Sequence, residues 1–145
     1  MLVVEPMRNA DAVPVARLAA QNLSESYSPE WLSENAAPAR TCLVARDVPT
    51  DKVVGFAVAA SEACEGHLLA LAVDQRYRGV GIGSALLRNV GRELTRSGAM
   101  RLKLEVRAED QATQGFYLRH GFAPEGLEEH VYSDGGDAVR MARPL

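Results

Sequence analysis

Three glycines separate an apolar run from an amphipathic segment near the middle of the chain. In LLALAVDQRYRGVGIGSALL, Gly79, Gly81 and Gly83 lie between a predicted strand and the first turn of a predicted helix. Glycines at such a junction let a ligand approach the free backbone N–H groups of the first helical turn closely. Those N–H groups, together with the charge of Arg78, favour an anion. The sequence therefore predicts a phosphate-binding turn between a strand and a helix.

The segments on either side of this turn predict a strand-helix-strand unit. Residues 67–73 form a largely apolar run, and residues 101–106 alternate charged with apolar side chains, as a strand does. Glu105 faces away from the apolar residues of its strand. A crossover of this kind favours parallel pairing of the two strands within one sheet. The helix between them ends near Gly98, and its apolar residues recur at every fourth position: Ile82, Leu86, Val90 and Leu94.

The patterns along the whole chain predict the α/β (α+β) class, with the element order β-α-α-β-β-β-α-β-α-β-β. Asp11 is expected to cap the first helix, and Gly121 to end the last. Helices are expected at 11–22, within SYSPEWLSEN, from 82 to near 98, and at 110–120. Strands are expected at 2–7, 41–47, 52–61, 67–73 and 101–106, and the last 24 residues are expected to form a hairpin around SDGGD.

Length and charge limit the class of protein. The chain has 145 residues and is 47% hydrophobic, which suits one domain over residues 1–145 with a core that needs no metal or disulfide. The formal net charge is -3, so we expect no nucleic-acid partner. Arginines gather between positions 76 and 96, and acidic residues between 125 and 137, so local sites for an anion and for a cation can coexist. No basic n-region and no run of 18 apolar residues occurs, and we expect a cytoplasmic protein with no membrane partner.

The cysteines and histidines predict no metal site. Cys42 and Cys64 lie in or beside apolar runs without a Cys-x-x-Cys pair, so reduced thiols are expected. His67, His120 and His130 share no metal-ligand spacing. Surface or capping roles are therefore expected for these histidines.

Three kinds of phosphate-binding turn match a glycine-rich strand-to-helix junction. A P-loop is excluded because no Gly-Lys-Ser or Gly-Lys-Thr follows. A dinucleotide-binding turn matches better, since Gly79 and Gly81 precede a helix and Glu105 ends the next strand. Its third glycine position is Ser84, however, and only 40 residues follow Glu105, too few for the rest of a doubly wound sheet. The third kind is Arg-x-x-Gly-x-Gly, which the sequence contains as RGVGIG.

The chain resembles the GCN5-related N-acetyltransferases, the GNAT family, over nearly its whole length. Their acetyl-CoA signature is Gln/Arg-x-x-Gly-x-Gly/Ala at a strand-to-helix turn, and RGVGIG matches it. LEVRAEDQATQGFYLRHGF and the closing VYSDGGDAVRM look most like the branch that acetylates protein N-termini, the RimI-type ribosomal-protein alanine acetyltransferases and their archaeal relatives. The resemblance implies the GNAT fold, with a mixed central sheet of about seven strands and four helices. It also implies acetyl-CoA as cosubstrate and no metal.

The resemblance implies roles for particular residues. Glu105 matches the general base of the family, and Tyr117 matches its general acid. The acceptor groove would include Tyr27, Trp31 and Tyr132. The pantetheine arm would pair with Leu71, Ala72 and Val73, and the pyrophosphate would lie on Arg78, Gly79, Val80, Gly81, Ile82, Gly83 and Ser84. Three positions depart from the pattern: Asp110 replaces an asparagine that contacts pantetheine, Gln75 replaces a proline, and Val131 replaces the first of two tyrosines.

Amine acetylation needs a neutral amine, which favours a protein N-terminal α-amine as acceptor. Its unperturbed pKa is about 8, against about 10.4 for lysine, so roughly a tenth of it is neutral at pH 7. Glu105 and Tyr117 then suit the two proton transfers, but the same residues also suit an ion-paired strand acid and a core tyrosine. A small-molecule amine as acceptor and a non-catalytic acyl-CoA-binding module are the alternatives. A monomer or a homodimer is expected.

Overall fold

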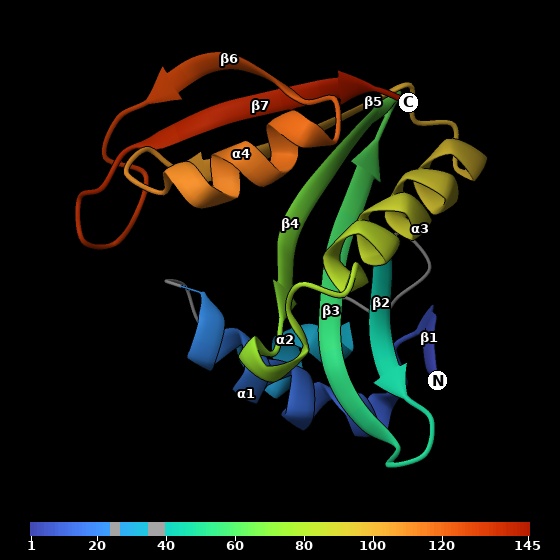
Figure 1. Ribbon diagram of the computed structural model, residues 1–145. Helices are drawn as coiled ribbons and strands as arrows, with labels where there is room; N and C mark the ends of the chain where they lie inside the picture. The colour runs from blue at the N-terminus through green and yellow to red at the C-terminus, as the bar shows by residue number, and fades with distance from the viewer. Residues whose placement is uncertain (24–26, 35–39) are drawn as a thin grey trace.

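Seven strands form one mixed sheet in the computed structural model, which describes residues 1–23, 27–34 and 40–145 (Figure 1). The sheet order is β1-β2-β3-β4-β5-β7-β6, and β4 and β5 are parallel neighbours. The strands are β1 (Leu2–Pro6), β2 (Arg40–Asp47), β3 (Lys52–Glu62), β4 (Glu65–Val73), β5 (Arg101–Arg107), β6 (Ala123–Glu128) and β7 (Ala138–Pro144). The helices are α1 (Ala12–Asn22), α2 (Pro29–Glu34), α3 (Ile82–Arg96) and α4 (Gln111–Arg119). The predicted element order, parallel pair and closing hairpin are confirmed.

Helices cover both faces of the sheet, and each face has its own apolar core. α3 and α4 lie on one face, while α1 and α2 lie on the other (Figure 1). Under α3, Leu86, Val90 and Leu94 each expose 1% or less, which confirms the amphipathic helix predicted from their spacing. Under α1, Val15 and Phe56 are fully buried. The sheet is thus held between two apolar layers, which fix its strands firmly on both sides.

β4 contains an extra residue that changes which side chains face each core. Val58 of β3 pairs with Ala70, whereas the next residue, Ala59, pairs with Leu68, so Leu69 has no partner residue in β3. Leu68 consequently belongs to the core under α3, and both Leu69 and Ala70 belong to the core under α1. A bulge of this kind bends a strand and increases its local twist.

The bulge lies next to the point where β4 and β5 separate. The two strands pair only from Glu65 to His67 on β4 and from Arg101 to Lys103 on β5. Beyond His67, no strand of the described residues pairs with β4 on that side, and Figure 1 shows the two strands moving apart. The glycine turn and α3 follow directly after the free part of β4, so this gap positions the candidate site.

A buried ion-pair network joins β2 to the start of α1. Arg46 is 5% exposed, and its guanidinium donates to Asp11 Oδ2 and to Glu5 Oε1, each at 2.7 Å. Asp11 occupies the predicted N-cap position of α1, but its side chain makes no capping bond to that helix. Its Oδ2 instead accepts the N–H of Arg8 at 2.9 Å and closes the 3-10 turn η1 (Asn9–Asp11). The physical reason is that a buried guanidinium requires a counter-charge.

Asp11→Asn tests the contribution of this network to stability. We expect the free energy of unfolding to fall by about 3 kcal/mol, because a buried charge loses a charged partner. Asp51→Asn is the matched control: Asp51 is 76% exposed and lies 3.5 Å from the same guanidinium. Its loss is expected to cost about 0.5 kcal/mol or less. Urea unfolding followed by circular dichroism measures both variants, and equal small effects would show that the buried pair adds nothing to stability.

Candidate active site

An open cleft of about 830 Å³ lies where β4 and β5 separate. Its lining comes from the end of α1, the free part of β4, the glycine turn with the start of α3, β5, α4, and the loop between β6 and β7. All the site residues expected from the sequence line this cleft except Val80 and Trp31. The fold therefore brings the predicted phosphate-binding turn together with both candidate catalytic residues, Glu105 and Tyr117.

The glycine turn has the backbone conformation that only glycine adopts readily. φ is +83° at Gly79 and +88° at Gly81, and a Cβ at either position would meet nothing within 4 Å. Gly81 is the N-cap of α3 and offers no side chain to its first N–H groups. A Cβ on Gly83 would lie 3.4 Å from the ring of Phe116, so α4 packs closely on this turn. The open space and the free N–H groups of a 15-residue helix fit a phosphate or pyrophosphate group.

Arg78 connects the glycine turn to β4 and α1 by two hydrogen bonds. Its Nε donates to the carbonyl of Val73 at 3.2 Å, and its Nη2 donates to Oδ1 of Asn22 at 2.6 Å. These bonds hold the end of β4 and the end of α1 against the turn. The side chain of Val80, 69% exposed, lies outside the cleft, and that of Ile82 lies mainly in the core. The backbone, rather than these two side chains, is therefore the part of the turn suited to binding an anion.

The free edge of β4 offers backbone hydrogen-bonding groups to the cleft. Residues 71–73 pair with β3 on one side, and within the described part of the chain no strand pairs with them on the other. A ligand that carries amide groups can bind along such an edge as an added strand does.

Asp110 lines the cleft, but its carboxylate is already engaged. It caps α4 by accepting the Thr113 N–H at 3.1 Å and the Thr113 hydroxyl at 2.7 Å. This local capping role explains an aspartate at the start of the helix. A direct contact of Asp110 with a cofactor stays a prediction.

Glu105 forms a short hydrogen bond with His67, a histidine for which the sequence predicted a surface or capping role. Oε2 of Glu105 lies 2.6 Å from Nε2 of His67, on the neighbouring strand. Because a carboxylate can only accept, this bond requires a proton on Nε2. The hydrogen bond from His67 lowers the pKa of Glu105 below its usual value, and this effect exceeds the opposing effect of partial burial. Glu105 is therefore ionised at neutral pH, with 28% of its side chain exposed.

Tyr117 has the opposite environment in the same cleft. It is 6% exposed, and its ring packs edge-on against those of Phe116 and Phe122, with centroids at 5.1 and 5.4 Å. Burial, with a smaller effect from the Asp110 carboxylate, raises the pKa of Tyr117 well above its usual value. The hydroxyl therefore stays protonated at neutral pH, and it can donate a hydrogen bond but not serve as a base.

Tyr27 and Trp31 stack on each other, but only Tyr27 lines the cleft. The Tyr27 hydroxyl donates to the carbonyl of Leu69 at 3.3 Å, and the two ring centroids lie 5.0 Å apart. Trp31 packs against the core under α1 instead of lining the cleft. Trp31 thus contacts Tyr27 from outside the cleft, and its place in an acceptor groove stays a prediction.

Tyr132 is held in the cleft by an arginine that sequence analysis missed. The guanidinium carbon of Arg107 lies 4.2 Å from the centre of the Tyr132 ring, a cation-π contact. Arg107 also pairs with Asp134 at 3.0 Å, in the loop that carries Tyr132. Its Nε is buried without a hydrogen-bond partner among the described residues. One side chain of β5 thereby fixes the loop between β6 and β7 against the cleft.

The remaining candidate groups of the sequence take no part in this cleft. Cys42 and Cys64 lie outside the cleft, and burial raises the pKa of the Cys42 thiol to about 11, which makes it unreactive. Within residues 1–23, 27–34 and 40–145, no group of His, Cys, Asp and Glu has the arrangement of a metal site. No helix in those ranges has the length and apolar character needed to span a membrane.

A comparison with family models identifies the family. The model of the acetyltransferase (GNAT) family matches residues 12–122. The chain therefore belongs to the acetyltransferase (GNAT) family, which confirms the resemblance of its motifs and of its fold.

Relatives with assigned activities are similar to parts of the chain. An N-alpha-acetyltransferase of Sulfurisphaera tokodaii is 37% identical over 82 residues, 56% of this chain and 49% of that protein. A ribosomal protein bS18-alanine N-acetyltransferase of Escherichia coli is 36% identical over 97 residues, 65% of this chain and 66% of that protein. The match thus spans 49 to 66% of the length of these two relatives. The crystal structure of the ribosomal-protein-S18-alanine N-acetyltransferase from Escherichia coli has a TM-score of 0.87 at 26% identity, covering 100% of this chain and 94% of that one.

His67→Leu tests the cause of the lowered pKa of Glu105. Without the hydrogen bond, partial burial remains, and we expect the pKa of Glu105 to rise toward or above its usual value. His67→Gln, which restores an N–H donor, should keep part of the lowering. Carbon-13 NMR titration of the glutamate carboxyls measures this, and an unchanged pKa in His67→Leu would contradict the assignment.

The same pair predicts a pH dependence of stability. A carboxyl whose folded-state pKa is lowered stabilises the fold above its unfolded pKa, and this contribution is lost as pH falls through the folded pKa. The difference in unfolding free energy between the wild type and His67→Leu should therefore shrink on acidification below the unfolded pKa of glutamate. Urea unfolding at a series of pH values measures it.

Proposed function

We propose that the protein is an acetyl-CoA-dependent N-acetyltransferase and that its acceptor is the α-amine of a protein N-terminus. The observation that carries the proposal is the cleft, because it joins an anion-binding glycine turn to an ionised carboxylate and a protonated phenol. Membership of the GNAT family and the names of the two relatives support this activity and this acceptor. On this proposal residues 1–145 act as one catalytic domain. A cytoplasmic location stays a prediction.

Acetyl-CoA supplies an acetyl thioester when it is bound, and this chain offers two surfaces for the rest of the molecule. Backbone N–H groups within residues 78–84 bind the pyrophosphate, and the free edge at residues 71–73 bonds to the pantetheine amides. Arg78 donates a hydrogen bond to the carbonyl of Val73 and so fixes the position of the glycine turn relative to the free edge of β4. Ser84 is oriented by a hydrogen bond of 2.9 Å to Nε2 of His120, at the end of α4.

Glu105, positioned by His67, accepts the proton that the acceptor amine loses. Taking a proton from a free ammonium group of pKa about 8 is uphill for a carboxylate, by about 1.4 kcal/mol for each unit of difference. Glu105 instead holds the neutral amine by a hydrogen bond and takes the proton as the amine attacks, when its acidity rises steeply. Nε2 of His67 already carries the proton of this hydrogen bond, so His67 positions Glu105 and does not take up the transferred proton. That proton leaves Glu105 for solvent, to which 28% of its side chain is exposed.

Tyr117 stabilises the departing thiolate as a hydrogen-bond donor. A free thiol has a pKa of about 8.5, far below that of the buried Tyr117, so complete transfer of the tyrosine proton is uphill. A donor fixed in an apolar wall stabilises developing negative charge more strongly than water does. The departing thiolate then takes a proton from solvent. This proton balances the one that the amine released through Glu105.

The acceptor N-terminus binds beside Tyr27 and Tyr132, which line the cleft. Arg107 supports this site by holding Tyr132 in place. Val131, 46% exposed in the same loop, lacks the hydroxyl that the resemblance leads us to expect there. This departure favours a small-molecule amine as the second candidate acceptor. Whether the protein is a monomer or a homodimer stays a prediction.

Gly81→Val tests the cofactor site, and Gly98→Val is its matched control. Their φ values are +88° and +94°, and a Cβ at either glycine would meet nothing within 4 Å, so the two substitutions carry similar backbone strain. A ligand at 100 times its Kd adds about 2.7 kcal/mol to the unfolding free energy. We expect acetyl-CoA to raise the Tm of the wild type and of Gly98→Val but not of Gly81→Val. Equal shifts in both variants, or stabilisation by NADH instead, would contradict the proposed site.

Glu105→Gln tests the proton acceptor and Tyr117→Phe tests the hydrogen-bond donor, because each substitution removes one functional group with little change in shape. We expect kcat to fall by about 10²- to 10⁴-fold in each variant, while the Tm shift with acetyl-CoA is retained. Glu62→Gln, at an exposed end of β3, is the control and should keep wild-type turnover. Near-normal kcat in either test variant would remove that residue from the mechanism. Binding of acetyl-CoA without transfer to any amine would favour the non-catalytic alternative.

A further inference from the structure

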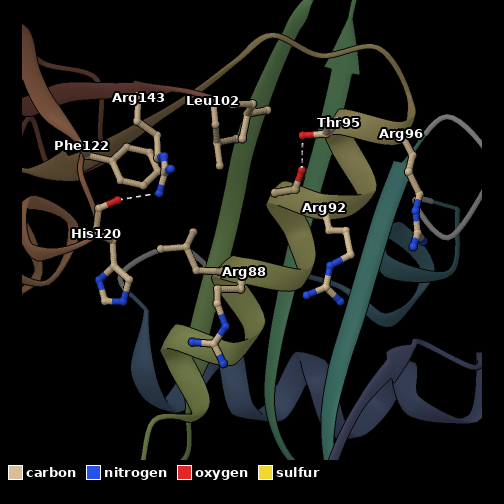
Figure 2. A pocket seen from close by; sticks show the side chains of 11 residues that line it. Arg88, Arg92, Thr95, Arg96, Leu102, His120, Phe122 and Arg143 are labelled. Carbon is tan, nitrogen blue, oxygen red and sulfur yellow. Dashed lines mark hydrogen bonds between the residues drawn. The ribbon is translucent and has the colours of Figure 1, made fainter.

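A second groove, of about 450 Å³, lies beside α3 and shares no lining residue with the cleft. Figure 2 shows it from close by, with α3 on one side and the end of α4 and β7 on the other. Its rim is cationic: three arginines extend from α3, and Arg143 comes from β7 (Figure 2). The arginines of α3 are Arg88, Arg92 and Arg96. The proposed acetyl transfer leaves this groove unused.

The rim of the groove is poorly neutralised. Among the described residues that line it none is acidic, although the whole chain carries a net charge of -3. Arg96 pairs with Glu93 at 2.6 Å, and Arg143 donates to the backbone carbonyl of His120 at 2.7 Å. Arg88 and Arg92 have no carboxylate within salt-bridge distance in the part of the chain that the structure covers. Arg88 and Arg92 therefore extend from successive turns of α3, with no carboxylate partner among the described residues (Figure 2).

This arrangement opposes the stability of α3. Like charges four residues apart on a helix face repel each other. A neighbouring carboxylate would relieve this repulsion. The chain has 19 acidic residues against 16 basic ones, yet none of the described residues that line the groove is acidic. A ligand that brings carboxylates to Arg88 and Arg92 removes the repulsion on binding.

The floor of the groove is apolar. Leu87, Leu102 and Phe122 lie there with 5%, 1% and 3% of their surfaces exposed, and Leu145 packs against the same core. An apolar side chain that enters the groove therefore meets hydrocarbon below and guanidinium groups at the rim. A ligand with carboxylates alone, or with apolar groups alone, uses only half of this surface.

We infer that this groove is a docking site for an extended acidic segment of another protein, in which acidic and apolar residues alternate. Arg88 and Arg92 are four residues apart on α3, a rise of about 6 Å. Alternate residues of an extended segment are about 6.6 Å apart, which is nearly the same spacing. Carboxylates at alternate positions thus meet successive arginines, while the side chains between them point toward the floor.

A nucleic acid fits the groove less well. Base recognition by a single strand needs exposed aromatic rings on which bases stack, whereas Phe122 is 3% exposed. The observations therefore favour a short acidic peptide that neutralises a local cluster of arginines.

Fluorescence anisotropy with a labelled, N-terminally acetylated peptide of alternating Glu and Leu tests this inference. The blocked N-terminus prevents the peptide from acting as an acceptor. We expect it to bind the wild type and to lose about tenfold or more in affinity with Arg88→Glu/Arg92→Glu. Arg17→Glu/Arg40→Glu is the control: both residues are exposed, and the change in net charge is the same. Arg88→Gln/Arg92→Gln, with a smaller change in charge, guards against loss of folding and should also weaken binding.

Several outcomes would overturn the inference. The first is equal affinity of the groove variants and the control variant for the acidic peptide. The second is equal affinity of the wild type for a peptide of alternating Lys and Leu. The third is tighter binding of a single-stranded oligouridylate to the wild type, with that binding abolished in the groove variants. The last result would assign the groove to nucleic acid. Gly81→Val should still bind the acidic peptide, so failure of the proposed acetyl transfer and failure of this docking site are measured separately.

Discussion

The separation of β4 from β5 is the constraint on which the candidate site depends. One extra residue, Leu69, bends β4 directly after the last residues that pair with β5. The bend leaves a strand edge whose backbone groups have no partner strand among the described residues, in the middle of a sheet covered by helices. Tyr27 donates to the carbonyl of Leu69 and Arg78 to that of Val73, and the rest of the edge lines the open cleft, where a ligand with amide groups can bond to it. The glycine turn at the end of the same strand adds an anion site in line with it.

Within this gap, two titratable groups are held in opposite protonation states by their surroundings. Glu105 is partly exposed and accepts a hydrogen bond from His67, which keeps it ionised. Tyr117 is packed among aromatic rings, and burial keeps it protonated. A pair of groups whose pKa values are driven apart in one cleft is the arrangement that acid and base catalysis requires. Glu105 is ionised because β4 places His67 beside it. Tyr117 is protonated because α4 places it between the rings of Phe116 and Phe122.

The sequence predicted most of the fold because hydrophobic period and turn chemistry are local. The spacing of Leu86, Val90 and Leu94 predicted α3, and the alternation around Glu105 predicted its outward face. Strand register is not local, so neither the bulge at Leu69 nor the pairing of His67 with Glu105 was predictable from spacing. For the same reason the sequence did not predict the pairing of Asp11 with Arg46, 35 residues away, or the contact of Arg107 with Tyr132 in a distant loop.

On the proposed function, this cleft directs acetyl transfer to an N-terminal α-amine. The most direct measurement uses one peptide that carries both a free N-terminus and an internal lysine, incubated with the protein and acetyl-CoA and then fragmented in a mass spectrometer. We expect one acetyl group on the α-amine, and no such product with Glu105→Gln. Acetylation of the lysine alone, or transfer to a polyamine or free amino acid while the peptide stays unmodified, would contradict it.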